Sequence, residues 1–341
     1  MQGDLRIDLP KNDSTTMNDF NLAYSSVLAA ERLTIGLMTP LAHQADRMPD
    51  VDFEVRSAAR ADRLGFAALW ARDVPLMIPQ GTSLEAVALD DPFLWLSRLA
   101  AATGSIALGT AAAVLPLRHP LHLSKIALSM DRLTKGRFIL GLGSGDRKAE
   151  FAAFGLDEAL RGDVFRAHWA IVRSALSPSA TEREILLATA GGYDLALAPK
   201  TRIPMLAVGS ARQTLQWIAE HAEGWATYHR EEERQRGRIG LWHSALRERA
   251  AGIQKPFVQS VHLDLLADPA APAEPIELGL RVGRRALVDY FARLQRHGVA
   301  HVILHLSRKS RPVLEVVDEL GLDVLPALRE GAMGGKANSF T

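Results

Sequence analysis

Short apolar segments alternate with amphipathic segments along most of the chain. The apolar segments have the length and aliphatic character of buried parallel strands. They cover residues 33–38, 66–70, 106–115, 138–142, 205–208, 225–228, 257–266 and 301–306. Helix-like patterns, with apolar residues three and four positions apart, follow them. These patterns cover residues 51–64, 92–102, 120–134, 163–176, 211–221, 231–250, 284–297 and 312–320.

Eight strands alternating with eight helices predict a single (β/α)8 TIM barrel of the α/β class. We expect the barrel domain at residues 31–330, between an amino-terminal arm (1–30) and a carboxyl-terminal tail (331–341). Residues 20–30 of the arm are expected to pack under the first strand. A doubly wound open sheet is the alternative, but its G-x-G-x-x-G pattern does not follow the first strand. The long loops at 74–90, 147–160 and 177–202 are candidate lids.

The composition is that of an ordinary globular protein, and it disfavours several classes of function. The chain has 341 residues, of which 48% are hydrophobic and 23% charged, and its formal net charge is +1. This balance gives no reason to expect nucleic acid or a membrane as a partner. Cysteine is absent, so disulfides, thiolate metal sites and a cysteine nucleophile are excluded, and we expect a cytoplasmic protein. The pattern predicts neither a transmembrane helix nor a signal peptide.

The segment from Ser105 to Arg147 carries the clearest candidate site. Its two apolar strands are joined by a helix, so they should be parallel neighbours. The first strand ends in small residues around Thr110, Ala111 and Ala112, and glycines occupy positions 141, 143 and 145 of the second. At period two, these glycines fall on one side of an extended segment. We predict that this side is open to a large flat ring, and tight helix packing is the alternative explanation of the small residues.

A candidate phosphate site lies between the fifth strand and the helix that follows it, in the sequence GSARQT (209–214). Free N–H groups at a helix start, together with hydroxyls and an arginine, suit a phosphate. An ordinary helix cap by Ser210 is an alternative that is compatible with phosphate binding.

Active sites of such barrels lie at the carboxyl ends of the strands. Arg72 and Asp73 end the second strand, where they either orient a substrate or form a structural ion pair. Of the 11 histidines, His119 beside the third strand is the active-site candidate. The histidines do not form a cluster on converging strand ends, so no metal site is predicted.

Residues 31–320 resemble the bacterial luciferase-like monooxygenases, which are flavin-dependent barrel enzymes. The most specific motifs are GTAAAVLPLRHP (109–120), DRLTKGRF (131–138) and GLGSGD (141–146). Supporting motifs are LGFAALWARDVP (64–75) and IPMLAVGSARQTLQWIAEHAEGWATY (203–228).

This resemblance implies FMN as the cofactor, or a deazaflavin in some branches of the family. It implies that the flavin ring lies over Thr110, Ala111 and Ala112, with a cis peptide bond between Ala111 and Ala112. The residues implied in phosphate binding are Gly209, Ser210, Ala211 and Thr214, together with the strand end at Ser144, Gly145 and Asp146.

The chain departs from the luciferases proper at two positions. Val74 replaces a histidine and Ser144 replaces an arginine, which disfavours light emission from a long-chain aldehyde. Arg147 is a candidate for the displaced positive charge.

The expected activity is that of a monooxygenase that uses reduced FMN and oxygen on a small organic substrate, with a separate flavin reductase. The alternatives are a deazaflavin-dependent dehydrogenase or reductase and a non-catalytic flavin-binding protein. The resemblance also implies a homodimer, for which apolar candidates in the second and third helices are Phe93, Leu94, Leu96, Leu99 and Leu128.

Overall fold

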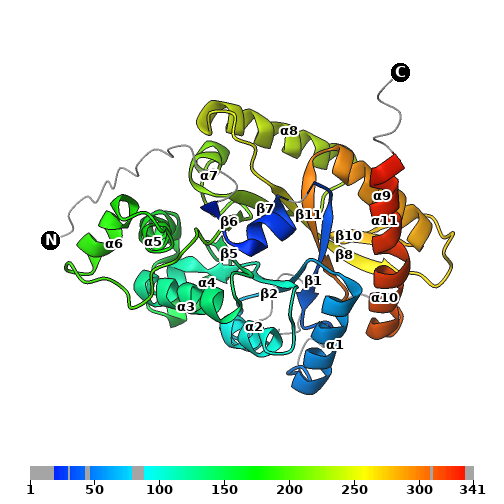
Figure 1. Ribbon diagram of the computed structural model, residues 1–341, viewed down its shortest axis with the longest axis horizontal. Coiled ribbons are helices and arrows are strands. Elements are labelled where there is room, and N and C mark those ends of the chain that lie inside the picture. The colour runs from blue at the N-terminus through cyan, green and yellow to red at the C-terminus, as the bar shows by residue number, and fades with distance from the viewer. Residues whose placement is uncertain (1–18, 30, 43–46, 79–87, 308–309, 335–341) are drawn as a thin grey trace.

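Eight parallel strands close into one barrel surrounded by helices in the computed structural model, which describes residues 19–29, 31–42, 47–78, 88–307 and 310–334 (Figure 1). The strands follow the order β11-β1-β2-β3-β5-β6-β7-β8, and β8 pairs with β11 to close the barrel. Their bounds are β1 (Thr34–Thr39), β2 (Ala68–Ala71), β3 (Ala107–Thr110), β5 (Phe138–Gly143), β6 (Met205–Val208), β7 (Gly224–Tyr228), β8 (Phe257–Leu265) and β11 (Val299–His305). The prediction of a closed (β/α)8 barrel is therefore confirmed.

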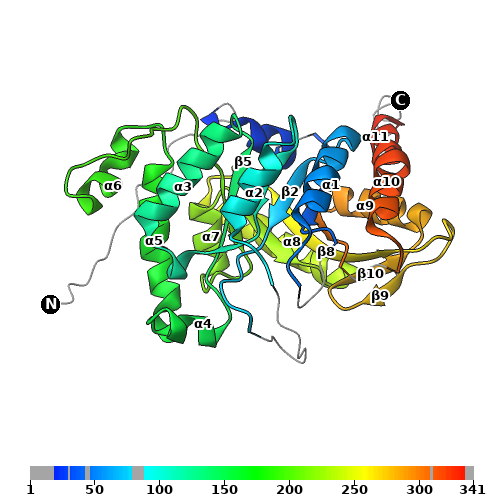
Figure 2. The same ribbon diagram turned by 90° about the horizontal axis from the view of Figure 1, so that it is seen from below.

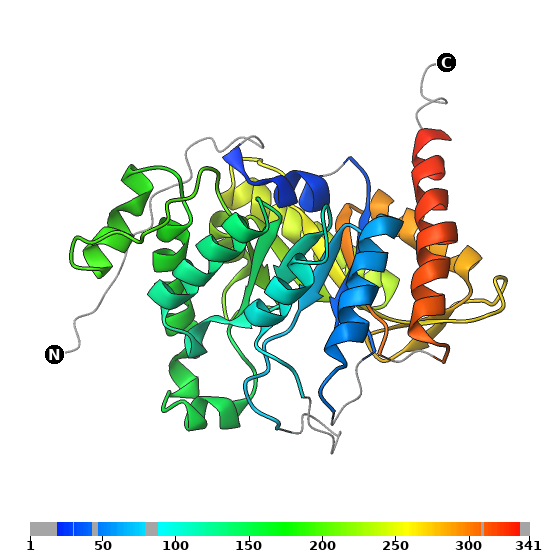
Figure 3. The same ribbon diagram turned by 60° about the horizontal axis from the view of Figure 1, so that its bottom comes forward.

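The longer helices follow the predicted alternation. They are α1 (Val51–Leu64), α2 (Pro92–Ala100), α3 (Pro120–Leu133), α5 (Arg161–Ala175), α7 (Leu215–His221), α8 (Glu232–Arg249), α9 (Arg284–Arg296), α10 (Val313–Glu319) and α11 (Leu325–Gly334). The π-helical turn η6 (Leu320–Val324) joins α10 to α11, and the three form one rod beside α9 (Figure 3). Because α11 ends at Gly334, the tail predicted from residue 331 begins inside a helix. None of the helices in the described ranges has the length and apolar character needed to cross a lipid bilayer.

The strands bury both of their faces. One face packs against the helices, and the other fills the barrel with a separate apolar cluster. The strand residues of this inner cluster are Met38, Ala68, Trp70, Ala107, Ile139, Leu206, Ala226, Val258 and Ile303. Because the interior is filled with side chains, the barrel has a packed core and no pore.

The π-helical turn η2 (Tyr24–Leu28) covers the amino-terminal end of the barrel. Thr34 Oγ1 donates to the Val27 carbonyl at 2.7 Å, and the Ala23 N–H donates to the Gly136 carbonyl at 2.9 Å. Figure 2 shows η2 (dark blue) and the short helix α4 (Lys148–Ala153) at opposite ends of the barrel. The carboxyl ends of the strands are therefore the end at which a site can form. Residues 1–18 of the predicted arm lie outside the described residues.

The third predicted strand, 106–115, is two strands in the structure. β3 ends at Thr110, and β4 (Ala113–Val114) resumes pairing with β5 after a cis peptide bond between Ala111 and Ala112. The cis bond was implied by the family resemblance and is confirmed. The segment between β8 and α9 contains two further strands, β9 (Glu274–Ile276) and β10 (Gly279–Val282), and β10 pairs with β8.

The apolar residues proposed for a dimer interface are mostly internal. Phe93, Leu96, Leu99 and Leu128 are buried within the chain, and only Leu94, at 74% exposure, faces outward. Those four residues pack between helices and barrel, so they cannot form the interface that the sequence suggested.

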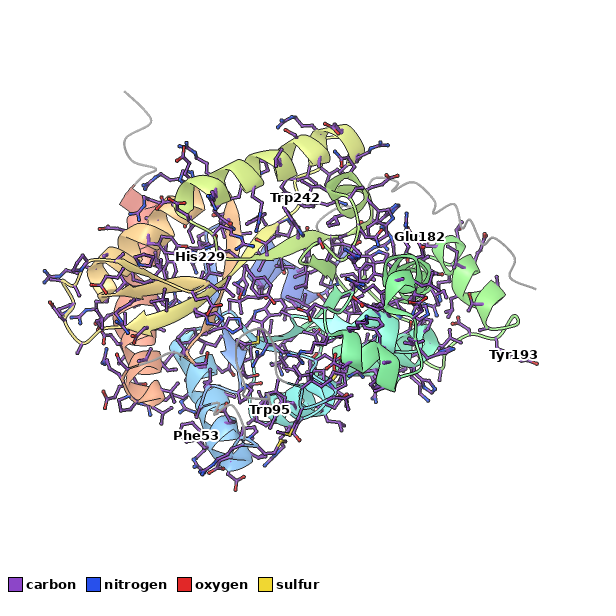
Figure 4. All side chains as sticks on the ribbon, turned by 180° about the vertical axis from the view of Figure 1, so that it is seen from behind. Phe53, Trp95, Glu182, Tyr193, His229 and Trp242 are labelled. Atoms are coloured by element: carbon purple, nitrogen blue, oxygen red, sulfur yellow. The ribbon has the colours of Figure 1, made fainter. Side chains whose placement is uncertain are left out.

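The segment 177–202 is not a lid over the carboxyl ends of the strands. It contains a 3-10 turn and the helix α6 (Glu184–Thr189). Arg183 Nη1 donates to the carbonyls of Ala175 and Ser177, which fastens the segment to the end of α5. The carboxyl-terminal ends of barrel helices lie near the amino-terminal ends of the strands, so the segment 177–202 lies at the end of the barrel away from the cavity. The prediction that this segment is a lid is therefore wrong. Figure 4 shows Tyr193 pointing away from the molecule at the tip of the segment.

Candidate active site

One cavity lies at the carboxyl ends of the strands and has a volume of about 410 Å³. That volume is within the range of small-molecule and cofactor sites. The predicted site residues that line it are Arg72, Asp73, Ala111, Ala112, Ser144, Gly145, Asp146, Gly209, Ser210 and Ala211. The cavity is also lined by residues not among the predicted site residues, namely Val74, Val114, Gly143, Arg147, Glu150, Arg161, Val208, Arg212 and Tyr228. The fold thus brings strand ends from distant parts of the chain together around one space.

Small and apolar residues form the floor of the cavity. Ala111, Ala112, Gly143 and Val208 contribute small or apolar surface at the ends of three neighbouring strands. Thr110, which was predicted to touch the ring, is fully buried below this floor. Its Oγ1 donates to the Gly141 carbonyl at 2.7 Å and accepts from the Gly141 N–H at 3.0 Å. Thr110 therefore supports the floor from beneath.

The sequence suggested that the glycines at positions 141, 143 and 145 leave one side of β5 and its end open. In the structure that side is not open. A Cβ on Gly141 would lie 2.0 Å from the Thr110 carbonyl oxygen, and one on Gly143 would lie 3.3 Å from the Ala112 Cβ. A Cβ on Gly145 would lie 2.9 Å from side-chain atoms of Phe151 and Val114. These glycines make room for the chain itself between residues 110 and 114, and only the floor that results faces the cavity.

The segment 209–214 forms a loop where a helix start was predicted. Ala211 and Arg212 have φ values of 47° and 57°, so the helix cannot begin there, and α7 starts at Leu215. Thr214 caps α7, and its Oγ1 accepts from the Trp217 N–H at 3.2 Å. The cap predicted at Ser210 is therefore at Thr214, which does not line the cavity.

Gly209 provides open space at the edge of the cavity. It has a φ of 68°, and a Cβ there would meet no atom within 4 Å. The loop is fastened to the start of α5, because Gln213 Nε2 donates to the Gly162 carbonyl at 2.8 Å. Ser210 and Arg212 thus lie beside Arg161 around a space that a phosphate group can occupy.

Arg161 was not predicted as a site residue. Its Nη1 donates to Glu158 Oε1 at 2.7 Å, while its Nε is buried and has no hydrogen-bond partner in the described part of the chain. The feature of the sequence that could have identified Arg161 as a site residue is its position at the start of a helix. In a barrel the helix starts face the same end as the carboxyl ends of the strands.

Arg147, proposed for the displaced positive charge, does line the cavity. Its Nη1 lies 3.3 Å from Oε1 of the buried Glu150, which also lines it. Burial raises the pKa of the Glu150 carboxyl above its usual value, and Arg147 opposes that shift. The charge of Arg147 is therefore partly balanced by Glu150, a neighbouring residue of the cavity wall.

Asp73 belongs to an ion pair, but its partner is Arg118 and not Arg72. Arg118 Nε donates to Asp73 Oδ2 and Arg118 Nη2 to Oδ1, both at 2.8 Å, and the Val114 N–H donates to Oδ2 at 3.0 Å. Burial lowers the pKa of Arg118, but the hydrogen bonds that it donates to Asp73 and Asp91, together with their negative charges, outweigh burial and raise that pKa above its usual value. Asp73 thus positions β4 and the cavity floor, which is a structural role.

His119 does not reach the cavity. It is exposed, caps α3, and its Nδ1 accepts from the Leu121 N–H at 3.3 Å. The rings of His262 within β8 and His305 at the end of β11 stack with centroids 4.7 Å apart, and His305 interacts electrostatically with Arg72 at the cavity. Burial lowers the pKa of His305 well below its usual value. No group of three or more metal-ligating side chains occurs among the described residues.

Comparison with known proteins shows that the chain matches the profile of one protein family. The profile of the luciferase-like monooxygenases matches residues 33–303. A similar curated protein is the 4-hydroxyprotoasukamycin monooxygenase of Streptomyces nodosus subsp. asukaensis, which is 28% identical over 131 residues. That alignment covers 38% of this chain and 33% of the relative, so the chain matches only about a third of that relative's length.

Solved structures share the fold over nearly their whole length. An F420-dependent secondary alcohol dehydrogenase, solved with an F420-acetone adduct, aligns with a TM-score of 0.66 at 14% identity, covering 87% of this chain and 99% of that chain. The oxygenating constituent of 3,6-diketocamphane monooxygenase from Pseudomonas putida, in complex with FMN, aligns with a TM-score of 0.63 at 13% identity, covering 86% of this chain and 98% of that chain.

Proposed function

Because the chain belongs to the luciferase-like monooxygenase family, we propose that it is a flavin-dependent oxidoreductase. The proposed reaction is oxygenation of a small organic substrate with reduced FMN and molecular oxygen. The reduced cofactor comes from a separate flavin reductase. The observation that carries this proposal is a cavity among the described residues that has a floor of small and apolar residues and, in addition, a loop lined by arginines.

The residues present fit a flavin mononucleotide. The floor at Ala111, Ala112 and Val208 suits the flat ring, and the open space at Gly209 suits the phosphate. The buried, unpartnered Nε of Arg161 is a donor that an anionic group would satisfy. A bound flavin supplies the redox chemistry, and the protein supplies binding, orientation and exclusion of water.

Other parts of the chain support these tasks. Ser210 and Arg212 hold the phosphate together with Arg161, and Ser144 and Asp146 line the cavity at the end of β5. The helix α4 carries Glu150 and covers one side of the cavity, which limits access of water. A homodimer is part of the proposal, and light scattering at micromolar concentration tests it.

A deazaflavin-dependent dehydrogenase is the second candidate, favoured by the likeness to the F420-dependent alcohol dehydrogenase. Titration of the purified protein with FMN and with F420, followed by absorbance and fluorescence, separates the two. A dissociation constant at least about tenfold lower for FMN supports the monooxygenase, and the reverse order supports the dehydrogenase. If neither cofactor binds at 100 micromolar, the proposed function is wrong.

Replacing Ala112 by leucine tests the position of the ring. The larger side chain would project into the floor of the cavity, so we expect cofactor affinity to fall at least about tenfold, or about 1.4 kcal/mol. Ala153→Leu on exposed α4 is the matched control and should leave affinity unchanged. Unfolding in urea should differ little between the variants, because both added side chains face space outside the core. Equal cofactor affinities in the two variants would place the ring elsewhere.

Ser210→Ala and Thr214→Ala separate the phosphate site from the helix cap. A lost hydrogen bond to a charged group is worth about 1.5–3 kcal/mol, so Ser210→Ala should weaken cofactor binding about tenfold or more. Thr214→Ala should instead lower the free energy of unfolding by about 1 kcal/mol through the lost cap of α7. Cofactor titration and urea unfolding of each variant measure the two effects. An affinity loss in Thr214→Ala as large as that in Ser210→Ala would return Thr214 to the phosphate site.

A further inference from the structure

Among the described residues, Arg72 is a cation at the cavity wall with a buried N–H donor that no acceptor satisfies. It follows β2 directly and lines the cavity beside the floor at Ala111 and Ala112. Its Nε is buried and has no hydrogen-bond partner within the described ranges. Asp73, the adjacent carboxylate, is already used by Arg118 and by the Val114 N–H. A buried guanidinium normally has its donors satisfied, so a group that satisfies Arg72 is expected in the cavity.

The neighbours of Arg72 favour an anion as that group. Burial lowers the pKa of Arg72, and the charge of Arg147 lowers it further, whereas Tyr228 opposes the shift. His305 interacts electrostatically with both His262 and Arg72, and its low pKa keeps its ring neutral near pH 7. This side of the cavity thus presents the Arg72 cation and the Tyr228 phenol, with the neutral imidazole of His305 nearby. Of the three carboxylates that line the cavity, Asp73 pairs with Arg118, Glu150 pairs with Arg147, and Asp146 is the third.

Arg72 and the proposed phosphate site lie at different strand ends around the same cavity. The loop 209–212 follows β6, and β3 and β5 separate β6 from β2 in the barrel. The phosphate site has cations of its own in Arg161 and Arg212. Arg72 is therefore available to a second ligand that lies at the other side of the ring.

We propose that Arg72 binds a carboxylate of the substrate and so restricts the enzyme to small organic acids. The guanidinium presents two parallel N–H donors that match the two oxygens of a carboxylate, and a neutral amide or alcohol cannot use both in this way. The His305 ring, which stacks on that of His262, interacts electrostatically with Arg72 beside this subsite. The inference rests on the proposed function, because it assigns the second ligand of the same cavity.

The test uses the cofactor-loaded protein and two pairs of probes, benzoate with benzamide and hexanoate with hexanamide. Binding is measured by calorimetry and by the change in cofactor absorbance, so turnover is not needed. We expect at least one carboxylate to bind about tenfold or more tightly than its amide. In Arg72→Gln this preference should disappear, while cofactor affinity should stay within about threefold of the unaltered protein.

Two further variants make the result specific. Arg161→Gln should weaken the cofactor and leave the carboxylate preference of the loaded protein intact, and Arg132→Gln on the exposed face of α3 should change neither. The inference is overturned if neither carboxylate is preferred over its amide, or if Arg72→Gln keeps the preference. It is also overturned if Arg72→Gln loses the cofactor, since Arg72 would then be a cofactor ligand. Failure of the unaltered protein to bind any flavin would instead remove the proposed function.

Discussion

Gly141→Ala should lower the free energy of unfolding by about 3 kcal/mol or more and should disrupt the cofactor site. The added methyl group would lie 2.0 Å from the Thr110 carbonyl oxygen, well inside van der Waals contact. Overpacking of a core usually costs about 1–3 kcal/mol. The two nearest atoms here belong to the backbone of Thr110, which has little room to relax. Any relaxation would shift Thr110, whose neighbours Ala111 and Ala112 form the floor of the cavity. Urea unfolding and cofactor titration measure the two effects.

Gly143→Ala is the matched control, since it adds the same methyl group two residues further along β5. Its Cβ would lie 3.3 Å from the Ala112 Cβ, so a shift of a few tenths of an ångström suffices. We expect a loss of about 1 kcal/mol or less from this change. If the two variants unfold at the same urea concentration, the close approach of Thr110 to Gly141 is not as tight as the structure shows.

Acidification should destabilise the protein through the buried His301. Its Nε2 accepts from Trp70 Nε1–H at 2.9 Å, and indole nitrogen can only donate. The imidazole proton therefore lies on Nδ1, which contacts Thr34 Oγ1 at 2.7 Å. A second proton on Nε2 would oppose the indole N–H. Burial accordingly lowers the pKa of His301 to about 3.

The sign of the effect follows from this lowered pKa. The unfolded chain binds a proton near pH 6.5 while the folded chain does not, so stability is complete above pH 6.5 and falls as pH decreases toward 3. Between pH 6.5 and 5 this one group should remove about 2 kcal/mol. In the His301→Gln variant, the glutamine amide can accept from Trp70 and donate to Thr34 without titrating. The free energy of unfolding of this variant should therefore fall by about 2 kcal/mol less between pH 6.5 and 5 than that of the unaltered protein. Urea unfolding at pH 7, 6 and 5 measures both slopes, and parallel slopes would refute the assignment.

The barrel was predictable because each strand and helix has its own local signals. At α1, for example, the side chain of Asp50 accepts from the N–H groups of Asp52 and Phe53, and Gly65 ends the helix with a φ of 84°. Both roles can be inferred from residue type and position alone. Repetition of such signals eight times identifies the architecture even where individual bounds shift by a few residues.

The contents of the site were less predictable, because spacing does not show what a residue faces. Period two correctly groups Gly141 and Gly143 on one side of β5, but only packing shows that the chain at Thr110 and Ala112 occupies that side. Helix periodicity includes Ala211 in α7, whereas its left-handed backbone makes it part of a loop. In both cases the tertiary environment overrides a local pattern.

Pairing of charges also depends on the folded chain. Asp73 stands beside Arg72 in the sequence, yet it pairs with Arg118, which follows the next barrel strand. This choice makes Asp73 structural and leaves Nε of Arg72, at the cavity wall, without a partner in the described part of the chain. Arg161 enters the site from a helix that begins 16 residues after Gly145, so no motif of contiguous residues includes it.

The amino-terminal cover of the barrel determines how the protein can be attached to a surface. Phe20 stacks on Tyr24 with ring centroids 4.2 Å apart, and Asp19 accepts from the Arg202 N–H at 2.7 Å beneath β6. A surface joined to the exposed side chain of Asp19 would therefore lie at the end of the barrel opposite the cavity. A sensor chip or electrode loaded in this way would leave the cavity open to the solution.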